Sequence, residues 1–386
     1  MRFSLRLPLA LVLTFGALAA FSLPVSAQQD GLSLPPDEYV RAKVLSVEEK
    51  GSRVDALGET DRLTDYRVRL LNGAEKGQEI GIEASAMGVK STQRMIKAGD
   101  VVVVVRSAQV DGSVRWYIAD NYRLPTLFWL TVGFFILAVL FGGWRGFTSM
   151  LGLAASVFII LGYIVPQILG GGNPFHATLI GTFAIAALSL YLAHGFNKRT
   201  SIAFAGTLIT LVLSALFAAL AVSLARMNGF GNEQSLYLQN GDFGAIDLRG
   251  LLLGGIMLGV LGVLDDITTA QSAVVDELKR ANPSLSFHEL YHRALSVGRE
   301  HIASLVNTLF LAYAGASLPL FLLFTVYKDQ PVWFLLNNEV ISEEIVRTLV
   351  GSVCLILAVP ITTALAAWVF SKTGADENAA PHSHAH

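Results

Sequence analysis

Long apolar segments dominate the second part of the chain and restrict what it can fold into. A helix that crosses the hydrocarbon core of a bilayer needs roughly 20 mainly apolar residues. Seven segments after Pro125 meet this condition, at 126–143, 147–169, 175–194, 201–225, 249–270, 301–326 and 345–370. The chain is 53% hydrophobic and 15% charged, with a mean hydropathy of +0.54. We therefore predict a polytopic membrane protein, with a bundle of about seven transmembrane helices at 125–372 in the lipid bilayer.

The N-terminus predicts a secretory signal peptide at residues 1–27. Two arginines precede an apolar stretch that ends in Val25-Ser26-Ala27, small residues of the kind found at a cleavage site. The alternative is a retained first transmembrane helix. Both interpretations send the following segment across the membrane.

Residues 28–124 have the composition of a small all-β domain. Segments such as EYVRAKVLSVEEK and AGDVVVVVRSA alternate polar with β-branched residues, and glycine-containing turns separate them. Four to six short strands predict a small barrel, OB-like or SH3-like. No aromatic cluster or basic surface indicates nucleic-acid binding. A partner protein is the ligand class that we keep open for this domain.

Basic residues predict the orientation of the chain. Eight of them lie at the segment ends on the side away from the β domain: Arg145, Lys198, Arg199, Lys279, Arg280, Arg293, Arg299 and Lys372. Four lie at the opposite ends after Pro125: Arg226, Arg249, Lys328 and Arg347. Lys and Arg are enriched in cytoplasmic connections. We therefore expect the β domain outside and the C-terminus inside, ending in a disordered, histidine-containing tail at 373–386.

The run GVLDDITTAQSAVVDEL, residues 262–278, places polar residues at the inner end of the fifth apolar segment. At about 100° per residue, one helical stripe contains Gly255, Gly259, Gly262 and Asp266. Small residues in a row let helices approach closely, so we expect helix packing there, within the chain or in a homo-oligomer, with Asp266 facing the bundle interior. A second stripe predicts a polar lane that contains Asp265, Thr269, Ser272 and Asp276.

The depth of Asp265 decides how this lane is interpreted. At about 1.5 Å per residue, Asp265 lies roughly 22 Å from Gly250, inside the hydrocarbon region near its inner edge. A carboxylate there costs about 2.5–3.5 kcal/mol and usually marks a path for an ion, proton or substrate. The alternative is that the helix enters the membrane a few residues later, which places both aspartates at the headgroup level.

The sixth segment carries the expected partners of these carboxylates. His301, Ser304 and Thr308 share a face of that helix, with Asn307 to one side. Asn307 should lie about 9 Å from the inner boundary, near the depth of Asp265, and the 277–300 connection allows the two helices to be antiparallel neighbours. His301 either titrates near neutral pH or is a solvated interfacial residue.

Hydroxyl groups also follow one face of the fourth segment, at Thr207, Thr210 and Ser214. Such hydroxyls usually bond to carbonyl groups of their own helix. We expect that local arrangement here.

The cytoplasmic connection contains HELYH, residues 288–292, which matches the H-E-x-x-H pattern in which two histidines bind zinc. His288 and His292 are weak candidate ligands, because no clear third ligand follows. Ser286 and Glu289 instead form the S-x-x-E pattern of a capping box. We favour a helix start at this position and expect no metal or other cofactor.

The β domain, the helical membrane domain, the run GVLDDITTAQSAVVDEL and the segment VGREHIASLVNTLFLAYAGASLPL together resemble the bacterial YibE/F proteins. The resemblance extends over nearly all the chain after the signal peptide. It implies a place in the bacterial cytoplasmic membrane but brings no established activity. Its motifs map onto Asp265, Asp266, Thr269, Ser272, Asn307 and Tyr313.

Two main hypotheses for function follow. The first is a permease or channel-like transporter of a small solute or ion, in which the aspartates bind a cation or exchange a proton and nearby oxygens serve as ligands. No P-loop motif indicates direct use of a nucleotide. The second is a non-transporting scaffold or sensor whose outer β domain binds a partner protein. A zinc hydrolase is a minor alternative.

Overall fold

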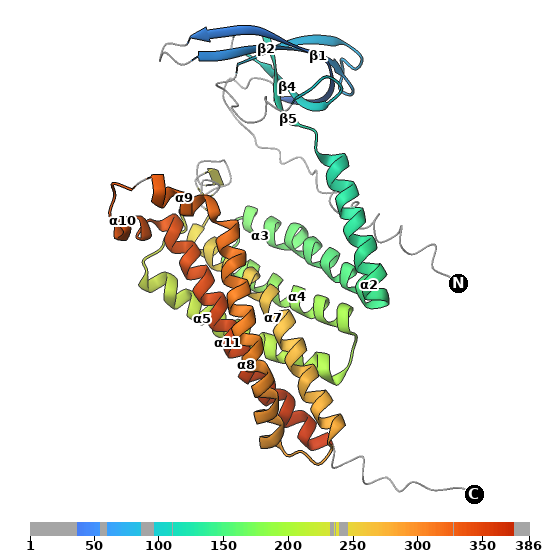
Figure 1. Cartoon of the computed structure of the whole chain (residues 1–386), viewed down its shortest axis with the longest axis vertical. Helices are drawn as coiled ribbons and strands as arrows, with labels where there is room; N and C mark the ends of the chain where they lie inside the picture. The colour runs from blue at the N-terminus through green and yellow to red at the C-terminus, as the bar shows by residue number, and fades with distance from the viewer. Residues whose placement is uncertain are drawn as a thin grey trace, which may run out of the picture. The chain divides into compact units, whose positions relative to one another are not determined.

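The computed structural model describes residues 37–54, 60–85, 96–109, 111–231, 235, 237–238, 246–326 and 328–373 (Figure 1). The chain divides into two compact units at Ile136 and Leu137, inside helix α2 (Leu124–Ile159). The predicted signal peptide and residues 374–386 of the predicted tail lie outside the described residues.

The first unit contains a five-stranded antiparallel sheet in the order β3-β2-β1-β4-β5. Its strands are β1 (Glu38–Val54), β2 (Thr60–Leu70), β3 (Glu79–Ser85), β4 (Val101–Ala108) and β5 (Val114–Asn121). The long strand β1 pairs with both β2 and β4, and the end strands β3 and β5 contact each other. The sheet is therefore curled into a half-barrel. The predicted strand number is confirmed, whereas the OB-like or SH3-like type stays a prediction.

Alternation along the strands builds the core of the half-barrel. Val40, Ala42 and Val44 are buried at every second position of β1, and Tyr66 and Val68 repeat the pattern on β2. Side chains two residues apart point to the same face of a strand. The apolar half of the alternating pattern is therefore the inner face of the curled sheet.

Glycines make the turns that the sequence predicts between strands. Gly73 and Gly77 lie between β2 and β3, Gly99 precedes β4, and Gly112 joins β4 to β5, each with a positive φ between 80° and 100°. Residues with a Cβ rarely adopt this conformation. These positions therefore fix where the chain reverses.

The helices after the sheet are α2, the π-helical turn η2 (Ile160–Ile164), α3 (Val165–Leu169), α4 (Pro174–His194), α5 (Lys198–Leu224), α7 (Leu248–Ala281), α8 (Phe287–Ala316), α9 (Leu318–Val326), α10 (Val332–Leu336) and α11 (Glu339–Thr373). Among the described residues, five helices are long and apolar enough to cross a membrane, or six if α8 and α9 form one span bent by 71°. The protein is thus an integral membrane protein by its helices. The predicted number of about seven is not confirmed.

The difference in number arises at α2. The first candidate span runs for 46 residues, from Leu124 to Leu169, about twice what one crossing needs. Its backbone is non-helical at Gly143, with φ 56° and ψ −137°, at the break between the first two predicted segments. A Cβ added at Gly146 would collide with the carbonyl oxygen of Ala138. The chain therefore turns sharply here, and whether its two arms cross separately stays a prediction.

Polar caps determine where the central helices begin. Asn173, Asn197 and Asp247 each accept a hydrogen bond from the backbone N–H three residues later, at the starts of α4, α5 and α7. A Cβ added at Gly250 would lie 3.4 Å from the backbone nitrogen of Phe175. Helices α4 and α7 therefore start side by side and run in the same direction.

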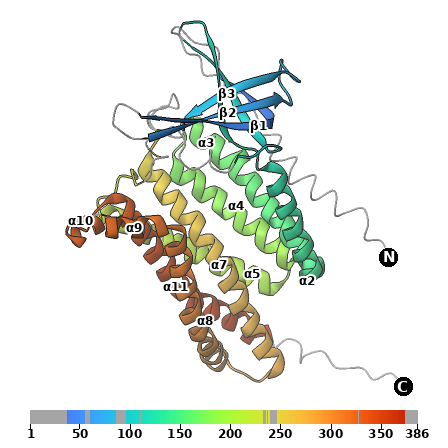
Figure 2. The same cartoon turned by 45° about the horizontal axis from the view of Figure 1, so that its top comes forward.

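Helix α7 lies at the centre of the helical unit. It packs against α4, α5, α8 and α11, and Figure 2 shows it between α4 and α11. Its buried face is mainly apolar. The apolar part includes Leu252, Ile256, Met257, Val260, Leu261, Leu264 and Ile267. Polar groups on this face are enclosed by neighbouring helices rather than by lipid.

The glycine stripe predicted on α7 packs against the described part of the chain at Gly259 only. A Cβ added at Gly255 or Gly262 would meet nothing within 4 Å among the described residues, whereas one at Gly259 would lie 2.9 Å from the hydroxyl oxygen of Tyr313 on α8. The neighbouring row approaches α4 closely at Gly254, where a Cβ would lie 2.6 Å from the Oγ1 of Thr178. The sequence contains two overlapping glycine rows, and spacing alone does not reveal which row a neighbouring helix covers. Packing of the Gly255 stripe between chains stays a prediction.

Neighbouring glycines on α7 give a matched test of this packing. We expect Gly254→Ala to lower the thermal stability of the purified protein, because overpacking a close contact costs about 1–3 kcal/mol. Gly255→Ala adds the same methyl group to an open position and should leave the melting temperature unchanged or slightly higher. Thermal melting in detergent measures both variants, and equal destabilisation would contradict the assignment of the packing row.

Candidate functional site

Asp265 is a partly buried carboxylate between two apolar helices. Its Oδ2 atom accepts a hydrogen bond of 2.6 Å from the Oγ of Ser189 on α4. Its Oδ1 atom is buried and has no hydrogen-bond partner among the described residues. One oxygen is therefore held in place, and the other is left for a proton, an ion or water to complete.

Ser189 was not among the residues that the sequence singled out. It lies 16 residues after the Asn173 cap of α4, and Asp265 lies 18 residues after the Asp247 cap of α7. Because the two helices start together and rise equally per residue, the side chains meet at nearly the same depth. The caps are visible in the sequence, but the pairing of α4 with α7 is not.

Asp266 differs from its neighbour and from our prediction. We expected this residue to continue a packing stripe and to point into the bundle. The structure leaves it exposed, on the same open side of α7 as Gly255 and Gly262. Consecutive helical residues point about 100° apart, so only one of the two aspartates can face α4, and that residue is Asp265.

The buried polar face of α7 continues beyond Asp265, although not through all the predicted residues. Thr268 exchanges a hydrogen bond of 2.8 Å with Thr207 of α5, and the Oγ of Ser272 donates to the backbone carbonyl of Arg199 at 2.9 Å. Thr269 instead donates to the carbonyl oxygen of Asp265 in its own helix. Thr268 therefore takes the place that we predicted for Thr269 in the polar lane.

Hydroxyl groups of α5 largely follow the expected local pattern. Thr210 donates to the carbonyl of Gly206, and Ser214 donates to that of Thr210. This part of the prediction is confirmed. The exception is Thr207, which contacts α7 through Thr268 and so joins the two helices.

Further buried polar atoms in the bundle lack a partner. Among the described residues these include Thr182 Oγ1 on α4, Gln271 Oε1 on α7 and Thr362 Oγ1 on α11. The amide nitrogen of Gln271 donates to the carbonyl of Ala294 on α8. An unsatisfied buried polar atom costs about 1–3 kcal/mol. The unpaired oxygen of Asp265 is thus one of several incomplete polar groups inside the helical unit.

The predicted contact between Asp265 and the sixth segment is not formed. His301, Asn307 and Thr308 on α8 are exposed, and the hydroxyl of Thr308 donates to the carbonyl of Ser304 in its own helix. The depth of Asp265 along α7 did not distinguish α8 from α4 as the helix that contacts it. The helix rotation that buries Leu309 (8% exposed) and Ala294 (0%) turns these polar groups outward.

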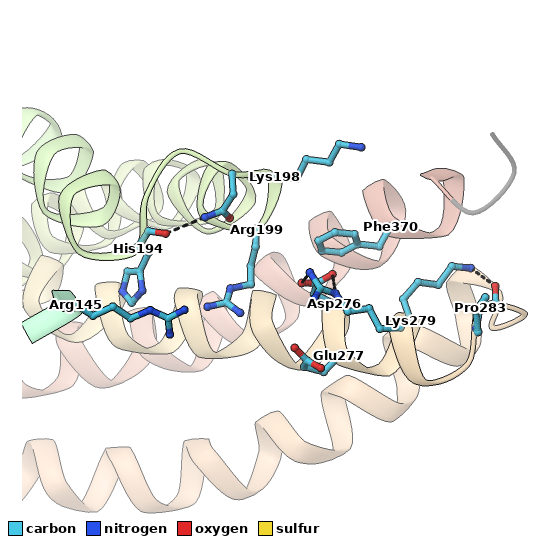
Figure 3. Close-up of a pocket in the computed structure, with 11 residues that line it drawn as sticks. Arg145, His194, Lys198, Arg199, Asp276, Glu277, Lys279, Pro283 and Phe370 are labelled. Atoms are coloured by element: carbon cyan, nitrogen blue, oxygen red, sulfur yellow. Dashed lines mark hydrogen bonds and ion pairs between the residues drawn. The ribbon is translucent and has the colours of Figure 1, made fainter. Parts of the chain in front are cut away.

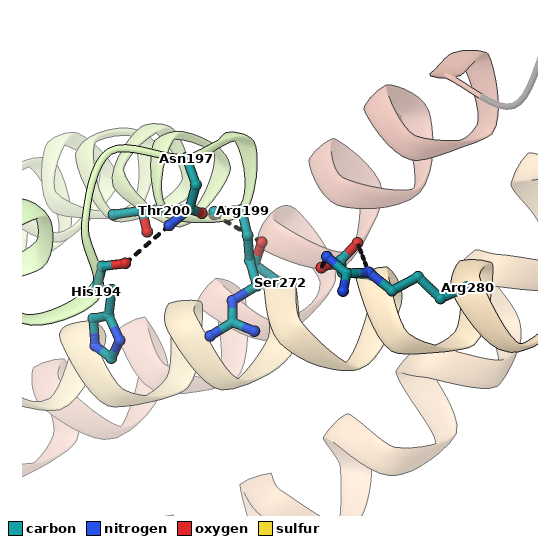
Figure 4. Close-up of polar contacts among 7 residues, drawn as sticks. His194, Asn197, Arg199, Thr200, Ser272 and Arg280 are labelled. Atoms are coloured by element: carbon teal, nitrogen blue, oxygen red, sulfur yellow. Dashed lines mark hydrogen bonds and ion pairs between the residues drawn. The ribbon is translucent and has the colours of Figure 1, made fainter. Parts of the chain in front are cut away.

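Asp276 ends the polar face of α7 at a cavity of about 760 Å³ (Figure 3). Its side chain is 10% exposed and forms an ion pair of 2.9 Å with Arg280 one turn later. Figure 4 shows Arg280 further along α7 than the contact between Ser272 and Arg199. The last member of the predicted lane, Asp276, therefore reaches the cavity, whereas Ser272 is fully buried one turn before it.

The HELYH segment forms the start of α8. Ser286 accepts a hydrogen bond from the backbone of Glu289, and the Glu289 carboxylate accepts one from the backbone of Ser286. The predicted capping box is confirmed. The rings of His288 and His292 stack 6.4 Å apart on the exposed side, and no group of three His, Cys, Asp or Glu residues suited to a metal occurs in the described part of the chain.

The helical unit and its half-barrel companion define an integral membrane protein with a small β domain. The family model of the YibE/F-like proteins matches residues 130–372, more than half of the chain. The chain belongs to the YibE/F-like family, as its resemblance implied. The match covers the helices, whereas the β sheet lies outside it. No curated protein and no solved structure matches the chain significantly.

Two serines, one at the N-cap of α8 and one inside the helix, test whether the HELYH segment is the start of a capped helix. Ser286→Ala should lower stability by about 1 kcal/mol, because it removes the N-cap acceptor. Ser296→Ala, at an exposed position inside α8, should change stability by less than about 0.5 kcal/mol. Thermal melting with metal analysis of His292→Ala completes the test. Stoichiometric zinc that disappears in this variant would restore the metal interpretation.

Proposed function

We propose that this protein is a permease or channel-like transporter that moves protons or a small cation, with Asp265 as the ion-binding or proton-exchanging group. One observation carries the proposal. Asp265 lies on a membrane-spanning helix, is oriented by Ser189, and keeps a buried oxygen without a partner. Ionisable groups inside membrane helices are costly and commonly belong to ion or proton pathways.

The surrounding polar groups supply a route from Asp265 to one end of the bundle. Thr268 is one turn further along the buried side of α7, followed by Ser272 and Asp276. Asp276 lines the solvent-facing cavity. A proton or cation that leaves Asp265 would meet oxygen atoms at short intervals along one helix face. This face is enclosed by α5 and α11, which keeps lipid away from the route.

The oxygen atoms around Asp265 favour the binding of a hard cation or a proton over the binding of an anion. Carboxylate, hydroxyl and carbonyl oxygens are the ligands of hard cations. No Lys, Arg or His side chain is within salt-bridge distance of Asp265 in the described part of the chain. The negative charge of this carboxylate is therefore available to the transported ion.

Adjacent aspartates allow a matched flux experiment. In proteoliposomes with an imposed membrane potential, proton and sodium entry are followed with ion-sensitive dyes. Asp265→Asn should lower the rate at least tenfold, since losing a positioned proton-transfer group costs roughly a hundredfold or more in enzymes. Asp266→Asn makes the same chemical change at the exposed neighbour and should stay within about twofold of the wild type.

Ser189→Ala completes this series. It retains the carboxylate but removes its only hydrogen bond among the described residues, so we expect an intermediate rate. Size-exclusion profiles and melting curves identify a variant that fails to fold. Equal flux in the wild type and Asp265→Asn, with both proteins folded, would remove Asp265 from the mechanism.

We also propose that the β domain is extracytoplasmic and the C-terminus cytoplasmic. Basic residues support this orientation, because Arg145, Lys198, Arg199, Lys279 and Arg280 gather around the cavity at one end of the helical unit. Such clusters are typical of cytoplasmic ends. The polar route from Asp265 then opens toward the cytoplasm.

Thiol labelling measures the orientation. In a Cys354→Ala background, which removes the single cysteine of the chain, Asp111→Cys places a thiol in the exposed β4–β5 turn and Ser284→Cys places one in the exposed α7–α8 turn. A membrane-impermeant maleimide should label the first thiol in intact spheroplasts and the second only after lysis. The reverse pattern would overturn the orientation.

A further inference from the structure

The cavity at the end of α7 carries a strong excess of positive charge. It has a volume of about 760 Å³, within the range of about 300–1,000 Å³ that is typical of small-ligand sites. Five cationic side chains and two carboxylates line it, a formal net charge of +3. The cations come from α2, α5 and α7, so residues far apart in the sequence converge on one hollow.

Several of these charges have no internal counterion. Asp276 is paired with Arg280, and Lys279 donates to the carbonyl oxygens of Pro283 and Leu285. The side chains of Arg145, Lys198 and Arg199 form no hydrogen bond or ion pair with other described residues. Glu277, the second carboxylate of the lining, is likewise in no ion pair among them.

Arg145 and Arg199 face the same space. In the view of Figure 3, both guanidinium groups are directed toward the imidazole of His194, and both are near enough to interact electrostatically with it. The carboxylate of Asp266 also interacts electrostatically with His194, although Asp266 does not line the cavity. Like charges that line one cavity repel each other, and an anion bound there would offset the repulsion.

The start of α5 adds to the positive field of the cavity. Asn197 caps this helix by accepting from the backbone of Thr200, so Lys198 and Arg199 occupy its first turn. The N-terminus of a long helix carries a partial positive charge and free N–H groups that favour anions. The bond from Ser272 to the carbonyl of Arg199 ties this turn to α7 and fixes its position.

Membrane topology alone does not account for this arrangement. Cytoplasmic enrichment of Lys and Arg requires positive residues on one side of the membrane, not their convergence around one cavity. Arg299 and Arg293, for example, contribute to this enrichment although they are exposed on α8 and do not line the cavity. Guanidinium pairs match the oxygens of phosphate groups in particular, because they donate bidentate hydrogen bonds.

We propose that the cavity formed by Arg145, His194, Lys198 and Arg199 is a binding site for a phosphate-bearing anion. The phosphate belongs either to the headgroup of an anionic phospholipid or to a soluble compound of the cytoplasm. This site is separate from Asp265 and does not depend on the proposed transport function.

The test uses the full-length protein and two probes. Inorganic pyrophosphate is titrated calorimetrically into protein in neutral detergent, and retention of phosphatidylglycerol against phosphatidylcholine is measured by native mass spectrometry. The double variant Arg145→Gln with Arg199→Gln should weaken binding of the preferred probe at least about tenfold, because each charge-assisted contact contributes about that factor. Arg299→Gln, which removes a charge of the same sign outside the cavity, should stay within about twofold.

Each outcome has a defined meaning. Pyrophosphate binding that depends on the two arginines indicates a soluble ligand, and selective retention of phosphatidylglycerol indicates a lipid headgroup. Arg199→Lys keeps the charge without the bidentate geometry and should therefore keep part of the affinity. Partial binding by this conservative variant would separate the loss of a contact from a folding defect in the double variant. If neither probe binds the wild type, or if Arg299→Gln weakens binding equally, the proposal is overturned.

Discussion

The low polarity of the lipid interior is the constraint on which the helical unit depends. A polar group there must find its partner within the protein, because lipid offers none. Helix α7 meets this constraint for several of its polar residues by placing them on the side that α4, α5, α8 and α11 enclose. Thr268 bonds to Thr207, Ser272 bonds to the backbone of α5, and Gln271 bonds to that of α8. Asp265 meets it only in part, since one of its oxygens is left unpaired. Gln271 also keeps a buried oxygen unpaired, so what distinguishes Asp265 from the other polar groups of the bundle is that its incomplete group is an ionisable carboxylate.

The two candidate sites lie along the same helix and suit opposite charges. Asp265, between α4 and α7, offers oxygen atoms and a negative charge. Around the end of α7, the cavity offers guanidinium groups and a helix N-terminus. Ser272 lies between them and donates a hydrogen bond to the backbone carbonyl of Arg199, which lines the cavity together with Asp276. An occupied anion site would place its charge at the end of the polar route, where it changes the local potential for a cation.

Local features of the fold were predictable because they depend on residues close together in the chain. The alternating strands, the glycine turns and the capping box of Ser286 and Glu289 all occur where the sequence places them. The hydroxyls of Thr210 and Ser214 bond within their own helix as expected. Long-range features were predicted less well. The glycine stripe and the partners on α8 were assigned from helix periodicity and depth, which leave the identity of the neighbouring helix open.

The sequence by itself determined that this chain is a membrane protein with a small β domain and that a pair of carboxylates interrupts one of its apolar segments. Both conclusions follow from composition and spacing, which folding does not alter. Only the tertiary structure decided that Asp265 faces Ser189 while Asp266 faces outward, that Gly254 rather than Gly255 packs closely, and that Arg145 joins Arg199 around one cavity. The physical reason is that the sequence does not fix the rotation of each helix about its own axis. Each helix has several faces of similar polarity, and only packing against specific neighbours selects which face is buried.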